Sequence, residues 1–143
     1  MILQLHSYWA YITFAIVLAT VLNAMLNLLS KNNFYIKNLR MALFALIVSH
    51  IQLLIGLSQY FMSPSYKHLK EIGMAAAMKD PLTRLLTVEH PLVMILAVVL
   101  ISIGFSKHKK KQKATEKFKT LTIYYGIALI LMLSRIPWEQ WFK

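Results

Sequence analysis

The chain has 143 residues, 58% of them hydrophobic, and carries 16 Lys and Arg against 5 Asp and Glu, a formal net charge of +11. Soluble domains are about 45–50% apolar, so this composition excludes a soluble enzyme and predicts a single membrane domain over residues 1–143. The chain has no cysteine, which excludes disulfides, thiolate–zinc sites, iron–sulfur ligation and covalent haem attachment. Because the basic residues fall between long apolar runs, the positive-inside rule explains them better than DNA binding does, and no nucleic acid partner is expected.

Residues 7–30 form the first predicted transmembrane helix. No basic residue precedes its apolar run and no small-x-small cleavage site follows, so we interpret it as a retained helix rather than a signal peptide. His6, Thr13, Thr20 and Asn27 are spaced by sevens and share one face if the helix begins early. That face is expected to look into a bundle, where interhelical hydrogen bonds satisfy its polar groups.

The second predicted helix, residues 41–62, has a histidine near its middle. A helix of that length spans roughly 33 Å, enough to cross the hydrocarbon of a bilayer. A titratable imidazole at membrane depth is costly without a partner, so His50 is a candidate functional residue.

The third predicted helix covers residues 81–106 and follows the one long connection. Within that connection, KEIGMAAAMK is predicted to form a short amphipathic segment on the membrane surface. Asp80 is a suitable N-cap and Pro81 a suitable first helical residue. Pro91 removes the amide that would bond the Thr87 carbonyl, which predicts a kink near His90. The alternative is that the membrane helix begins at Pro91, with His90 in its entrance.

The fourth predicted helix covers residues 120–137, after a basic stretch at 107–119 that is expected to be a solvated loop. The first and third connections carry three and seven basic residues, and the second carries four that are offset by two acidic ones. The positive-inside rule therefore predicts an all-α bundle of four transmembrane helices, with both termini on the outer (periplasmic) face. His108 lies in the basic stretch and is not expected to be a ligand.

The candidate site is built from histidines in the outer half of the bundle. Counted from the outer helix ends, His50 lies about 18 Å deep and His90 about 15 Å deep, so the two are expected to face each other. If the third helix enters the membrane only near Leu86, the depths of His50 and His90 differ by about 10 Å and the two do not face each other. Two imidazoles at matched depth are what bis-histidine haem b ligation requires, and they are also the proposed metal ligands, binding the haem iron. Arg135 is expected to meet the haem propionates, and His6 is the substitute ligand.

Two other uses of these residues stay open. Glu89, beside His90, would orient a ligand or carry protons, and the three histidines near one face would also suit a divalent metal ion. A cofactor-free structural or assembly subunit of a larger membrane complex is the alternative function, because the chain is small and has an inward polar stripe.

Four segments of the chain resemble small bacterial four-helix membrane proteins usually labelled cytochrome b-like. The resemblance covers most of the chain except its loops, and it implies His6, His50 and His90 as the characteristic histidines. The function expected from the residues and the resemblance together is a haem b-binding electron-transfer protein of the bacterial inner (cytoplasmic) membrane. It would exchange electrons with quinone or a respiratory complex, as a homo- or hetero-oligomer. The four segments are LHSYWAY (Leu5–Tyr11), SHIQLLIGLSQYF (Ser49–Phe61), VEHPLVMILAVVLISIG (Val88–Gly104) and SRIPW (Ser134–Trp138).

Overall fold

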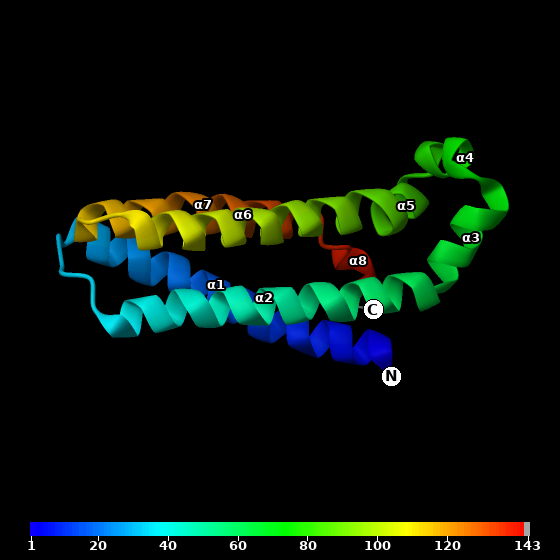
Figure 1. Ribbon diagram of the computed structural model, residues 1–143. Coiled ribbons are helices and arrows are strands. Elements are labelled where there is room, and N and C mark those ends of the chain that lie inside the picture. The colour runs from blue at the N-terminus through cyan, green and yellow to red at the C-terminus, as the bar shows by residue number, and fades with distance from the viewer. Residues whose placement is uncertain (142–143) are drawn as a thin grey trace.

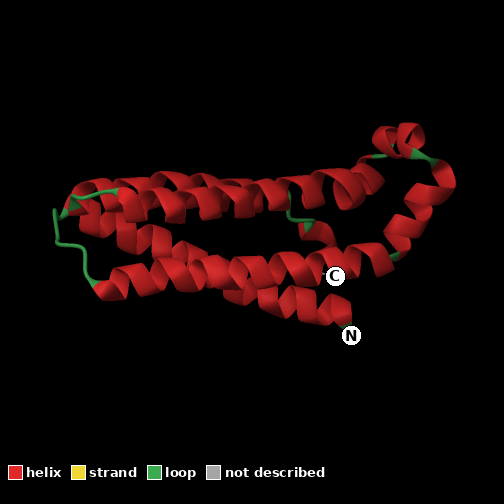
Figure 2. Cartoon of the chain, in the orientation of Figure 1, coloured by secondary structure: helices red, strands yellow, loops and turns green. Residues whose placement is uncertain are grey.

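The described part of the chain, residues 1–141 of a computed structural model, is a bundle of helices without a β-strand (Figures 1 and 2). Four helical segments are long and apolar enough to cross a membrane, as expected of a multi-pass membrane protein, and the predicted all-α four-helix bundle is confirmed. In chain order the elements are α1 (Ile2–Leu29), α2 (Ile36–Met62), α3 (Pro64–Ile72), α4 (Met74–Lys79), α5 (Pro81–Arg84), the π-helical turn η1 (Leu85–Glu89), α6 (His90–Lys110), α7 (Ala114–Ser134) and α8 (Trp138–Trp141).

The long helices alternate in direction and pack as a ring, with α1 against α2 and α7, and α6 against α7 and α2. The ring has two different ends. At the short-loop end, brief connections join α1 to α2 and α6 to α7. At the termini end, α1 begins and α7 ends, while α3 and α4 form an arch from α2 to α5 (Figure 1).

Many of the buried side chains in the interior are small, and Tyr125 is the largest that is fully buried among the described residues. Tyr125 of α7 is fully buried, and its hydroxyl donates a hydrogen bond of 2.9 Å to the Ala42 carbonyl of α2, which stands diagonally across the bundle. A buried tyrosine needs such a partner, because its hydroxyl is otherwise costly to remove from water. The alanines with 1% exposure or less on the four long helices are Ala24, Ala42, Ala45, Ala97 and Ala128.

The polar stripe of α1 faces the bundle as expected, at least in its middle. Thr13 and Thr20 are both buried. Thr13 donates to the Val48 carbonyl at 3.3 Å, and the Trp9 indole donates to the same carbonyl at 2.9 Å. These two bonds tie α1 to α2, whereas Thr20 bonds within its own helix to Ile16.

At the short-loop end the helices run past their apolar segments. The second helix begins at Ile36 rather than Met41, and α6 continues through the basic residues to Lys110. Lysine is a good helix former, so the end of an apolar run need not end a helix. The prediction of a loop over residues 107–119 is therefore wrong, because only residues 111–113 lie between α6 and α7. His108 is fully buried, 5.7 Å from the Phe34 ring and 5.0 Å from the Phe105 ring.

The helix changes its hydrogen-bond pattern just before Pro91, whereas the predicted kink near His90 stays a prediction. The backbone amide of His90 bonds the Leu85 carbonyl, five residues back, and residues Leu85–Glu89 form the π-helical turn η1. The Thr87 carbonyl, which Pro91 cannot bond, accepts a hydrogen bond of 2.9 Å from the Tyr60 hydroxyl of α2. This hydrogen bond therefore ties α2 to the π-helical turn η1, directly before α6.

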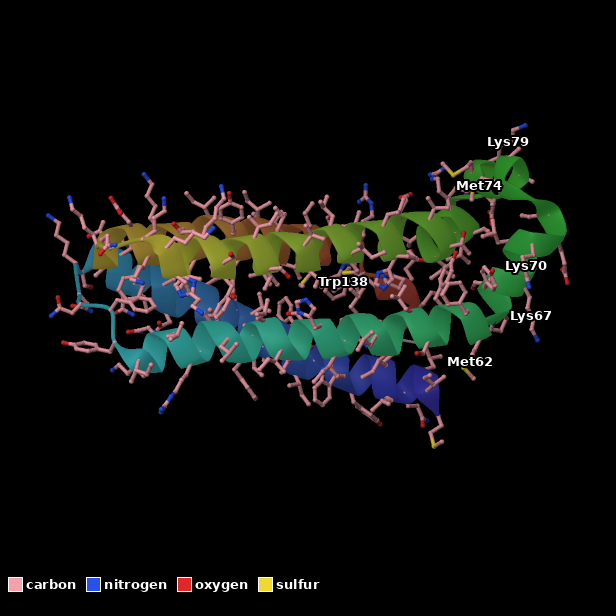
Figure 3. The ribbon with its side chains drawn as sticks, in the orientation of Figure 1. Met62, Lys67, Lys70, Met74, Lys79 and Trp138 are labelled. Carbon is pink, nitrogen blue, oxygen red and sulfur yellow. The ribbon has the colours of Figure 1, made fainter. Side chains whose placement is uncertain are left out.

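The arch at the termini end is helical, with defined caps. Gly73, with φ +83°, separates α3 from α4 in a backbone conformation that favours glycine. Asp80 caps α5 as predicted, accepting from the amide and the hydroxyl of Thr83, and these bonds lower the pKa of its carboxyl below the usual value. Figure 3 shows that three lysines of α3 and α4 point away from the bundle: Lys67, Lys70 and Lys79. The predicted location of this segment on the membrane surface stays a prediction.

Candidate functional site

Two of the three candidate histidines meet at the termini end. The ring centres of His6 (α1) and His90 (α6) lie 6.2 Å apart, with the ring planes nearly perpendicular at 88°. Position 6 falls in the second turn of α1, and position 90 follows directly after η1. We call His6 and His90, with Gln52, Gly56, Arg84, Glu89 and Arg135, the histidine site.

His6 is held by helix α2. The Gln52 amide donates to the His6 carbonyl oxygen at 3.0 Å and to His6 Nδ1 at 3.2 Å. One turn further along α2, Gly56 leaves the space in which the ring lies, because a Cβ there would come within 3.0 Å of His6 Cε1. The amide and the missing side chain together fix where the imidazole sits.

His90 is oriented by the end of α7. Its Nδ1 donates to the Arg135 carbonyl oxygen at 2.8 Å. A carbonyl can only accept, so the proton is on Nδ1 and the Nε2 lone pair of the neutral ring remains available. A hydrogen bond from the other ring nitrogen to a backbone carbonyl is the arrangement that metal-binding histidines usually have.

The charged members of the site form a row beside His90. Glu89 accepts from Arg84 Nε at 3.0 Å through one carboxylate oxygen and pairs with Arg135 Nε at 3.4 Å through the other. Arg84 also donates to the Met78 carbonyl at 2.7 Å, which ties the row to α4. Two guanidinium groups share one carboxylate, so the row carries one net positive charge.

The expected pairing of His50 with His90 is wrong. His50 Nε2 lies 3.4 Å from Ser102 Oγ on α6, and Ser102 is twelve residues beyond His90 in the same helix. Twelve residues of helix correspond to about 18 Å, so the two imidazoles lie at clearly different levels of the bundle. Tyr60, not His50, is the α2 residue next to the turn that precedes His90.

No family model, curated protein or solved structure matches the chain. Within residues 1–141 no three His, Cys, Asp or Glu side chains are grouped so as to hold a metal ion, so the three-histidine metal site is not formed. His6 and His90 are left as two neighbouring imidazoles from different helices.

The fit of a bis-histidine metal centre can be tested on the ring spacing. Two metal–imidazole bonds of about 2 Å each, extended to the ring centres, give roughly 6 Å. The observed separation of 6.2 Å is close to that value. Within the described chain the buried Gln52 Oε1 has no hydrogen-bond partner. Gln52 Nε2 donates to His6 Nδ1, so the neutral His6 ring carries its proton on Nε2, and this bond would have to be lost and the proton moved to Nδ1 before Nε2 could bind a metal.

Sequence reasoning named His6, His90, Glu89 and Arg135 but missed what surrounds them. Gln52 and Gly56 are four residues apart and so share one face of α2, which was visible in the sequence. The level at which that face meets His6 was not visible, because it depends on how far α1 and α2 slide past each other.

Proposed function

We propose that the protein is a haem b-binding membrane electron-transfer protein, in which His6 and His90 are the axial ligands and a quinone is the electron partner. The observation that carries the proposal is the pair of neighbouring imidazoles on two different helices, with ring centres 6.2 Å apart and ring planes nearly perpendicular. A haem bound between them supplies one-electron chemistry, and the protein supplies its ligands and surroundings.

The proton position of His90 supports this assignment. The Arg135 carbonyl holds the proton of His90 on Nδ1, so Nε2 is presented as a lone pair. For His6, Gln52 Nε2 donates to Nδ1, so a ligating Nε2 would require this bond to be lost and the ring proton to move to Nδ1. Only His90 thus has an acceptor on Nδ1 that would orient a ligating Nε2.

The row of charges supports it as well. Haem carries two propionates, and Arg84 and Arg135 both lie beside the His90 end of the site. Arginine is well suited to carboxylates because its planar guanidinium can donate two parallel hydrogen bonds. In this proposal the propionates would share the guanidinium groups that Glu89 now holds.

The location follows the charge distribution. With the first and third connections on the cytoplasmic side of a bacterial inner membrane, the termini end and the histidine site lie in the outer half of the bilayer. The proposed protein would thus exchange electrons near the periplasmic surface. This orientation and the resemblance to cytochrome b-like proteins belong to the proposal.

Absorption spectroscopy tests the proposal directly. The protein, purified in detergent from haem-replete cells, should show a Soret band and a six-coordinate low-spin spectrum. His6→Ala and His90→Ala should each lose the low-spin form. His50→Ala should keep it, because His50 lies beside Ser102, about 18 Å along α6 from His90. His50→Ala is the matched control, since it removes the same side chain from the middle of a long helix.

Two results would contradict the proposal. A colourless, monodisperse preparation from haem-replete cells would favour the cofactor-free structural or assembly subunit. Loss of the low-spin spectrum in His50→Ala alone would mean that the ligands are not the neighbouring pair of His6 and His90.

A further inference from the structure

The third candidate histidine, His50, has a setting of its own. It lies near the middle of α2 and is exposed, opposite Ser102 of α6. In a membrane helix an exposed residue at this level faces lipid or another bound molecule. An imidazole in contact with hydrocarbon alone is costly, because its polar nitrogens lose the hydrogen bonds that water would give them.

The hydrogen bonds of His50 and Ser102 leave His50 Nε2 without a strong donor. His50 Nδ1 donates to the Leu46 carbonyl at 2.8 Å, so Nε2 has no proton and can only accept. The nearest donor to Nε2 is the Ser102 hydroxyl at 3.4 Å. That hydroxyl has a single hydrogen, and it also lies 2.8 Å from the Val98 carbonyl, the shorter and better bond. His50 Nε2 and the Ser102 oxygen therefore both offer lone pairs.

The surface around the pair is apolar. Ile47 and Leu54 flank His50 at one helical turn on either side and are 45% and 66% exposed. Val99, next to Ser102 by the same spacing, is 45% exposed. A molecule that reaches this pair must dissolve in the lipid phase and must bring its own hydrogen-bond donor.

We infer that His50 and Ser102 bind a hydroxyl of a lipid-soluble hydroquinone. A hydroquinone carries two hydroxyl donors on a ring that partitions into membranes, whereas the corresponding quinone carries only acceptors. A second copy of the chain fits less well, because a two-fold axis at His50 would bring the two Nε2 acceptors against each other. The inference rests on the proposed function in that a quinone is the electron partner there, but the binding itself needs no haem.

Calorimetric titration in phosphatidylcholine nanodiscs tests the inference. The probes are a decyl-substituted benzohydroquinone and the matching benzoquinone, with empty nanodiscs as the reference for partitioning. The hydroquinone should bind more tightly than the quinone, and His50→Leu should weaken it about tenfold, the value of one good hydrogen bond. Ser102→Ala should weaken it about threefold. Ser58→Ala should have no effect: it is the matched control, an exposed serine of α2 that bonds its own helix at Leu54.

Two further measurements make the result specific. The Nε2 resonance of ¹⁵N-labelled His50 should move on titration with the hydroquinone and stay in place with the quinone. His50→Gln, whose side-chain oxygen can accept, should recover part of the affinity and also covers the case in which His50→Leu does not fold.

Three outcomes would overturn the inference. Equal affinity for the two probes would remove the donor argument, and unchanged binding in both His50 variants would move the site elsewhere. A dimer that His50→Leu converts to a monomer would assign this surface to self-association. If the hydroquinone binds as expected to a protein without a Soret band, the haem proposal fails and the hydroquinone site stands.

Discussion

Gly56→Ala tests the geometry that holds His6 in place. The new Cβ would lie 3.0 Å from His6 Cε1 and 3.4 Å from Nδ1. Carbon atoms in contact prefer about 3.5–4.0 Å, so the ring must retreat by roughly 0.5 Å or more. The bond of 3.2 Å between Gln52 Nε2 and His6 Nδ1 would then exceed the length of a useful hydrogen bond.

Two free-energy terms oppose each other in this variant. Losing the Gln52 bond costs about 1 kcal/mol, and replacing glycine by alanine within a helix contributes about 1 kcal/mol in the other direction. The free energy of unfolding should therefore change little. Gly126→Ala is the control, because nothing lies within 4 Å of its Cβ position in α7 and only the helix term applies. The two variants should differ by about 1 kcal/mol.

Reversible unfolding in mixed micelles with increasing sodium dodecyl sulfate, followed by circular dichroism, measures the difference. The same preparations should be compared by absorption spectroscopy, where only Gly56→Ala should lower the low-spin fraction. If Gly56→Ala stabilises the protein as much as Gly126→Ala and leaves the spectrum unchanged, His6 does not rest on Gly56.

Three further changes probe the helix contacts. Gly104→Ala would place a Cβ 2.4 Å from Tyr124 Cβ, so α6 and α7 must separate; unfolding in mixed micelles should show a loss of about 1–3 kcal/mol, and an unchanged midpoint would contradict this packing. Tyr60→Phe leaves the Thr87 carbonyl without its donor and should cost about 1 kcal/mol by the same measurement, whereas a neutral result would mean that this carbonyl has another partner. Asp80 has a lowered pKa in the folded chain, so its stabilisation is complete above the unfolded value of 3.8 and is lost as the pH falls through the folded value. Melting temperatures measured from pH 6 downward should fall further in the parent chain than in Asp80→Ala, and an equal fall in both would contradict the role of this carboxyl.

The fold was largely predictable because its signals are local. Long apolar runs placed the four helices, Asp80 and Pro81 marked the start of α5, and Pro91 marked the break before α6. The ends at 36 and 110 were missed because hydropathy reports which residues suit lipid, and a helix can continue into the headgroup region. The burial of His108 was missed because it depends on the ring of Phe34, which comes from the segment before α2 and itself packs on Phe118 of α7.

The pairing within the histidine site was only half predictable. Chemistry pointed to His6, His90 and Arg135, which the structure brings together. The depth of His90 was counted from Asp80, but Tyr60 meets Thr87, so α5 extends past the end of α2 into the arch. The count therefore included residues outside the packed part of the bundle. Counting from Leu86 would have shown that His50 and His90 do not match.

Tyr125, which reaches across the bundle interior to α2, affects whether ions or solutes could pass through the protein. With its phenol wedged among alanines and anchored to the opposite helix, the centre of a single copy has no open bore for ions or solutes. Passage along the axis would require this ring to swing out and its bond to break.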